Sequence, residues 1–189
     1  MRKINIKNLI AKSYLILLLI WGVASFFLFS GLAISIWPIM VISIIAIYFS
    51  ISQTANQFLL VYISFLLLYG IYGFQYIYNF PLWIALVMLI LSSSVLLFFL
   101  YSSHDNIKKF LPLFLALFAI MNIEIYLTLS FWLINPLSRS FIAALSIYLF
   151  AGYLESITES SFNRSKFNIY LFTSGILLVI LLMTSSWGR

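Results

Sequence analysis

Hydrophobic residues run through this chain in long blocks, and the polar interruptions between the blocks are the main guide to its structure. No Asp, Glu, Lys or Arg occurs between residues 13 and 103. Boundaries in that region must come from turn residues, at Ser30-Gly31, at the polar run 52–57 and at 75–80. A helix needs about 20 apolar residues to cross a membrane, so the blocks predict transmembrane helices. The seven expected spans are 13–29, 32–51, 58–74, 81–101, 110–134, 137–154 and 168–186.

Composition supports this interpretation. Of the 189 residues, 65% are hydrophobic and 7% are charged, whereas about a quarter of the residues of a soluble domain are charged. Seven crossings use nearly the whole chain and leave no room for a soluble domain. The sequence therefore predicts an all-α, polytopic transmembrane helical bundle in which any function resides in the bundle or its short loops.

The four prolines fit these spans. Pro38, Pro81 and Pro112 would lie in or near first helical turns, where the missing N–H group is harmless. Pro136 is expected in a loop. No proline is then expected to break a helix interior.

The positive charges predict an orientation. The formal net charge is +6, but its distribution indicates a topology signal rather than a nucleic-acid partner. With seven spans, one side of the membrane holds Arg2, Lys3, Lys7, Lys12, Lys108, Lys109, Arg164 and Lys166, and the other holds Arg139 and Arg189. The positive-inside rule then predicts a multi-pass protein of the plasma membrane with a cytoplasmic N-terminus and an external C-terminus. If residues 13–51 formed one helix, the two central lysines would be external, which the rule disfavours.

Aromatic residues give a second indication of the membrane boundary. In the seven-helix arrangement the tryptophans at 37, 83, 132 and 187 fall near the outer ends of their spans, and Trp21 lies mid-span. The tyrosines at 69, 72, 76 and 78 lie beside them in sequence. Trp and Tyr favour the bilayer interface, so we expect a lipid-facing belt rather than an aromatic binding cage.

Glu124 is the acidic residue that lies deep inside a hydrophobic run. A charge at that depth costs roughly 3 kcal/mol on insertion scales, so we expect it to face the interior of the bundle. Thr128 follows one turn later and Asn135 eleven residues later, which predicts a polar stripe, while Asn122 and Tyr126 add polarity on neighbouring faces. One interpretation is a site for a proton, a cation or a polar ligand. The other is a carboxyl group hydrogen-bonded across the bundle to fix its packing.

Other chemistry is sparse. The chain has no cysteine, no glycine-rich phosphate loop and no nucleophile elbow. His104 and Asp105 are the one His–acid pair, and a cluster with Glu155 and Glu159 is conceivable. We expect no catalytic residue, metal site or cofactor. Small residues that favour close helix packing are Gly70, Gly73, Ser140, Ala143, Ala144, Ala151 and Gly152.

The segment EIYLTLSFWLINPLSRSFI, residues 124–142, carries an acidic residue before a Leu-Ser-Phe stretch and a proline-containing turn. It resembles an uncharacterised family of small polytopic membrane proteins from candidate-phyla bacteria. The resemblance covers about a tenth of the chain. Because that family has no established activity, the resemblance assigns no role to Glu124.

These observations favour a non-enzymatic bundle that acts as a subunit or binding partner in a membrane assembly, with the lipid bilayer and other membrane proteins as its partners. The alternative is a transporter or substrate-capture component that uses Glu124 as a proton, cation or polar-ligand site. A membrane enzyme is the third hypothesis, and it would need Glu124 with Tyr126, or His104 with Asp105, for acid–base chemistry.

Overall fold

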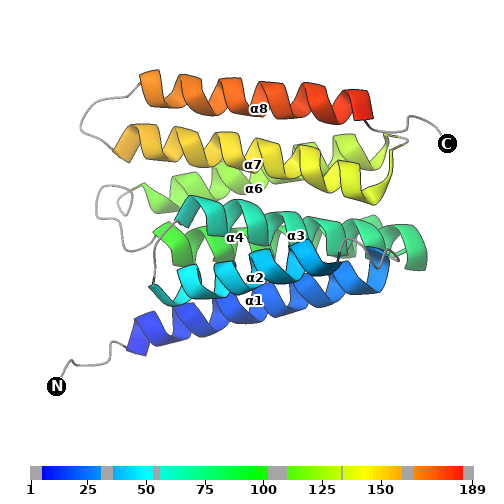
Figure 1. Ribbon diagram of the computed structural model, residues 1–189, viewed down its shortest axis with the longest axis horizontal. Helices are drawn as coiled ribbons and strands as arrows, with labels where there is room; N and C mark the ends of the chain where they lie inside the picture. Colours follow the sequence, from blue (N-terminus) through cyan, green and yellow to red (C-terminus); the bar gives the residue numbers. More distant parts are fainter. Residues whose placement is uncertain are drawn as a thin grey trace.

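The fold is a bundle of long helices, seen in a computed structural model (Figure 1). The structure describes residues 6–30, 36–52, 56–101, 110–132, 134–158 and 164–184. Within these ranges every regular element is an α-helix, and there are seven. They are α1 (Ile6–Ser30), α2 (Ile36–Ser52), α3 (Asn56–Tyr78), α4 (Leu82–Tyr101), α6 (Leu111–Ser130), α7 (Pro136–Thr158) and α8 (Arg164–Thr184).

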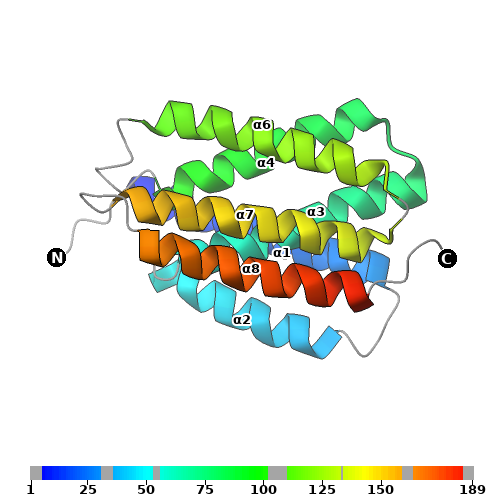
Figure 2. The same cartoon turned by 90° about the horizontal axis from the view of Figure 1, so that it is seen from above.

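The helices run up and down the bundle in alternation, so the start of α1 and the end of α8 lie at opposite ends (Figures 1 and 2). This is the consequence of an odd number of helices that alternate in direction. The predicted break near Ser30-Gly31 is confirmed, because α1 ends at Ser30 and α2 begins at Ile36. Residues 13–51 therefore form two helices and not one.

Four helices are long and apolar enough to cross a membrane. Their candidate spans are Lys12–Phe29, Gln57–Tyr78, Leu111–Ser130 and Pro136–Leu154. Shorter apolar segments lie in the other three helices, at Trp37–Ser50, Leu82–Phe98 and Phe167–Met183. Large apolar side chains also cover the outer faces of α2, α6 and α8. The protein is thus an all-α transmembrane bundle, and no separate soluble domain is found among the described residues.

Helix α3 is the centre of the bundle and packs against α1, α4 and α7. Its side chains Leu59, Leu60, Ile63 and Leu66 are completely buried. Figures 1 and 2 show the other helices arranged around it. The fold therefore places at its core a helix without charged residues, a property that α3 shares with α2 and α4.

Glycines allow the closest approaches between helices. A Cβ atom added at Gly70 would lie 2.8 Å from the Cβ of Ser25 on α1. A Cβ added at Gly152 would meet the ring of Tyr170 on α8. The prediction that these glycines support close packing is confirmed. Gly22, which the sequence did not single out, has the same role, since its Cβ would lie 2.7 Å from the Cβ of Leu66.

The prolines lie at helix starts. Pro38 and Pro112 are in the first turns of α2 and α6, and the carbonyl of Pro81 accepts the first backbone hydrogen bond of α4, from Ile84 at 3.0 Å. The prediction that Pro136 lies in a loop is wrong, because Pro136 is the first residue of α7. Its fixed φ and missing N–H group suit that position.

The aromatic belt is confirmed only in part. Trp37, Trp83 and Trp132 are exposed, and α2 begins, α4 begins and α6 ends at the same end of the bundle (Figure 1). Tyr69 and Tyr72, however, are buried, so the prediction that they face lipid is wrong. In the C-terminal half of α3 the exposed residues begin at Tyr76, because the turns before it are covered by neighbouring helices. Trp187 lies outside the described residues.

Candidate functional site

Helix α6 has two faces of different character. Asn122 and Tyr126 are buried, whereas Glu124 and Thr128 are exposed. The prediction that Glu124 faces the interior is therefore wrong. The physical reason is the helical period. Side chains two residues apart on an α-helix point in directions that differ by about 200°. Asn122 and Tyr126, four residues apart, occupy the inner face, so Glu124 between them must point outwards.

The predicted polar stripe stops at the end of α6. The Thr128 hydroxyl donates to the backbone carbonyl of Glu124 at 2.8 Å, which keeps both residues on the outer face. Asn135 does not continue this face, because α6 ends at Ser130. Its Oδ1 instead accepts a hydrogen bond from the backbone N–H of Ser138 at 2.7 Å and caps the start of α7. The five predicted site residues thus do not form one site.

Tyr126 belongs to a buried aromatic pair on the inner face. Its ring stacks on that of Tyr72 from α3, with centroids 4.6 Å apart and an interplanar angle of 17°. The Tyr126 hydroxyl donates to Oε1 of Gln75 at 2.7 Å. The carbonyl of Tyr126 accepts from the hydroxyls of Tyr72, at 3.4 Å, and Ser130, at 2.7 Å. These contacts join α3 to α6. They also give the hydroxyl groups of both buried tyrosines a hydrogen-bond acceptor.

Arg139 closes the same region from α7. Its Nε donates to the carbonyl of Ile134 at 2.9 Å, and its Nη2 donates to the carbonyl of Trp132 at 2.7 Å. Its guanidinium carbon lies 5.8 Å from the centre of the Tyr72 ring. The arginine therefore holds the turn between α6 and α7.

Glu124 stands alone on an apolar surface. The exposed residues that share the outer face of α6 with it and Thr128 include Leu113, Leu117, Ile120 and Phe131. Among the described residues no side chain donates a hydrogen bond to its carboxyl group. The same helix buries only 28% of its span inside the bundle. An acidic group thus lies within an apolar face that the rest of the bundle leaves uncovered.

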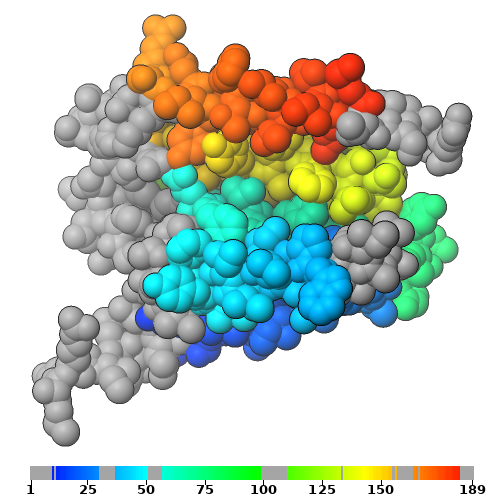
Figure 3. All heavy atoms as spheres, in the orientation of Figure 1, coloured from blue at the N-terminus to red at the C-terminus, as the bar shows by residue number. Residues whose placement is uncertain are grey.

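A separate apolar groove lies between α2, α3, α7 and α8. It has a volume of about 710 Å³ and includes Ile39, Phe65, Phe141 and Leu177 in its walls. In Figure 3 it appears as a recess between the cyan surface of α2 and the orange-red surface of α8, with α3 and α7 behind it. No sequence pattern indicates this groove, because its walls come from two helix pairs, α2 with α3 and α7 with α8, that are far apart in the chain.

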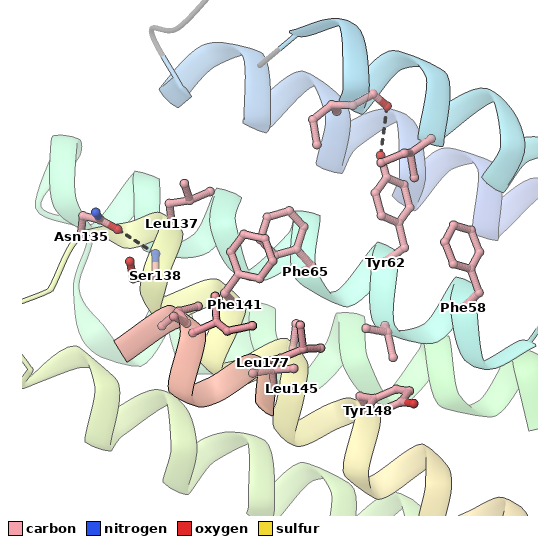
Figure 4. Close-up of a pocket in the computed structure, with 16 residues that line it drawn as sticks. Phe58, Tyr62, Phe65, Asn135, Leu137, Ser138, Phe141, Leu145, Tyr148 and Leu177 are labelled. Atoms are coloured by element: carbon pink, nitrogen blue, oxygen red, sulfur yellow. Dashed lines mark hydrogen bonds between the residues drawn. The ribbon is translucent and has the colours of Figure 1, made fainter. Parts of the chain in front are cut away.

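The polar groups of this groove are few. Figure 4 shows Tyr62 turned towards α2, where its hydroxyl lies 2.8 Å from the Ser43 hydroxyl and donates to the Ile39 carbonyl at 3.1 Å. Asn135 and Ser138 lie together at one end (Figure 4). Because the Tyr62 hydroxyl is already paired, the middle of the groove is apolar.

No group of three metal-ligating side chains occurs in the part of the chain that the structure describes. The cluster conceived from His104, Asp105 and Glu159 lies outside that part, as does the side chain of Glu155. The described residues thus provide two features that a ligand or partner can use, the α6 face around Glu124 and the groove. Comparison of the chain with protein-family models, with curated proteins and with solved structures finds no match, so the resemblance of residues 124–142 stays a prediction.

Proposed function

We propose that this protein is a non-enzymatic subunit of a membrane assembly and that it docks through the outer face of α6. We place it in the plasma membrane with its N-terminus in the cytoplasm, on the basis of the distribution of its cations. The observation that carries the proposal is the exposure of Glu124 within an otherwise apolar face.

The depth of Glu124 within α6 makes its exposure to lipid costly. Glu124 lies six residues before the end of α6, roughly 9 Å inside it at 1.5 Å per residue. Lys and Arg can reach the headgroups from such positions with their long stems, but the two-carbon stem of Glu is shorter. Left against lipid, a charge there costs roughly 3 kcal/mol. A partner that supplies a polar contact removes this cost.

The partner that fits is a transmembrane helix of a different protein with a Lys or Arg at the matching depth. A second copy in a two-fold arrangement would place Glu124 against Glu124. The cations of the described helices lie within the first two turns of α1, α7 or α8, so a second copy offers none at mid-helix. Charge complementarity therefore favours a foreign helix.

A photo-crosslinking amino acid placed at Leu117 or Ile120 in cells tests the proposal, with the same group at the exposed Ile44 on α2 as the control. We expect one heavier adduct from the α6 positions, absent at Ile44 and lost in Glu124→Leu and Glu124→Gln. Sequencing of the adduct should show an intramembrane Lys or Arg. Exchange of the two charges, with Glu124→Lys and the partner cation replaced by Glu, should restore the adduct.

Two results would reject this function. One is an adduct that contains only a second copy of this chain. The other is an adduct whose yield is the same in wild type and in both Glu124 variants. The transport alternative has less support from the geometry, because Glu124 is not among the residues that line the groove.

A further inference from the structure

The groove between α2, α3, α7 and α8 opens sideways, towards the space that lipid occupies around a transmembrane bundle. In Figure 3 the recess faces out between the helices, perpendicular to their long axes. An apolar hollow of this size does not hold ordered water, which needs several polar partners. If the groove were empty, the side chains of its walls would lose dispersion contacts. A hydrocarbon occupant is therefore the stable state in a bilayer.

The dimensions of the groove match one leaflet. Along α7 its wall runs from Leu137 to Tyr148, eleven residues or roughly 16 Å. Half of the hydrocarbon core of a bilayer is about 15 Å thick. The volume of about 710 Å³ falls in the range of ligand pockets, about 300–1,000 Å³. A single chain of one leaflet fits this length, whereas a molecule that spans the bilayer does not.

Helix α8, which forms one wall of the groove, is attached to α3 and α7 through Tyr170 in its first half. The Tyr170 hydroxyl in the first half of α8 donates to Gln57 of α3, and its ring packs 4.9 Å from that of Tyr148. The second half of α8 contributes Leu177 and Leu181 to the wall of the groove.

The polar end of the groove suits the start of an acyl chain. The Oδ1 of Asn135 is occupied by its capping bond, which leaves the Nδ2 group as a donor at the helix end, and Asn135 is exposed. We propose that the groove binds one acyl chain of a membrane phospholipid, with the ester group near Asn135 and the chain along Phe141 and Leu145. This inference is independent of the docking face on α6.

Labelling with a phospholipid that carries a diazirine in one acyl chain tests the inference on the full chain in nanodiscs. Mass spectrometry should find more label on Phe141, Leu145 and Leu177 than on Leu113 and Leu117, which sample the surrounding lipid. Leu177→Trp fills the groove from an exposed position and should reduce the groove label several-fold. Ile176→Trp, the same change at the neighbouring exposed residue that does not line the groove, should leave it unchanged.

A second measurement separates a phospholipid from a free fatty acid. Native mass spectrometry of the purified protein should show one retained phospholipid in wild type and in Ile176→Trp, and none in Leu177→Trp. Glu124→Leu should retain the lipid, so failure of the docking proposal does not affect this result. Groove labelling no greater than that of the α6 face would overturn the inference. Displacement of the label by free fatty acid but not by phospholipid would also overturn it.

Discussion

Helices α3 and α6 are similar in sequence character and opposite in position. Both are long apolar candidate spans of nearly equal mean hydropathy, yet 78% of the α3 span is buried inside the bundle and only 28% of the α6 span is. In water, hydrophobicity would determine how much of each helix is buried. In a bilayer it does not, because lipid tails are as apolar as leucine.

Packing geometry separates the two helices. Helix α3 has Gly70 and Gly73, and at both positions side chains of α1 approach the backbone closely. Helix α6 contains no glycine and packs on the bundle through a narrower face that includes Phe118, Asn122 and Tyr126. Close van der Waals contact is a main force between transmembrane helices. The helix that allows contact on several sides therefore becomes the centre, and the other remains at the edge.

Removal of the stacked ring between the two helices should have the largest effect. We expect Tyr126→Ala to lower the free energy of unfolding by about 3–5 kcal/mol, as for a large aromatic residue removed from a core. Titration of the detergent-solubilised protein with a denaturing detergent measures it. Phe131→Ala, where the ring is 79% exposed, is the control and should change little. Equal losses in both variants would show that α6 is not held by its inner face.

Obstruction of the central helix should have the next largest effect. A leucine at Gly70 would force α1 away from α3, since even its Cβ would lie 2.8 Å from Ser25. We expect Gly70→Leu to lower the unfolding free energy by about 1–3 kcal/mol, the usual cost of overpacking. Gly175 on α8 has open space around it, so Gly175→Leu is the matched control. An unchanged Gly70→Leu protein in the same titration would contradict the central position of α3.

The hydrogen bond across α3 and α6 should contribute less than the rings. Tyr126→Phe keeps the stacking and removes the bond to Gln75, so the expected loss is about 0.6 kcal/mol, the average for such bonds in membrane proteins. A double-mutant cycle with Gln75→Leu isolates this contribution. If the two single losses add completely in the double variant, the two side chains do not interact.

Glu124 should have the smallest effect on the isolated protein. Because its side chain points away from the bundle, Glu124→Leu and Glu124→Gln should each change the unfolding free energy by less than about 0.5 kcal/mol, the range of surface substitutions. The same titration measures this, beside the crosslinking yield in cells. A clear loss of stability in the leucine variant would restore the view that Glu124 fixes the packing of the bundle.

Much of the fold could be predicted from the sequence. The seven helices, the break after Ser30 and the prolines at helix starts follow from block length and turn residues, which are local properties. Gly70 and Gly152 could be recognised as contact positions because small residues matter wherever helices touch. Pro136 is an exception, because the predicted span begins at residue 137, whereas the Asn135 cap lets α7 begin at Pro136.

The candidate site was less predictable. The predicted site requires the Glu124 carboxyl group to find a polar contact within its own chain, but the structure places this side chain on the outer face. A direct comparison with Asn122 and Tyr126 on the helical period would have shown that all three cannot share one face. It would not have shown which face is buried.

The sequence by itself determined that the chain forms seven apolar helices, four of them long enough to span a membrane, with one acidic residue inside a span. The physical reason is that length and composition set what a bilayer accepts. Only the tertiary structure decided which helix is central, which face of α6 is covered and that four helices enclose a groove. In lipid these choices depend on shape complementarity and paired polar groups between distant segments, such as Tyr72 with Tyr126, and apolar residues carry no preference between helix and lipid.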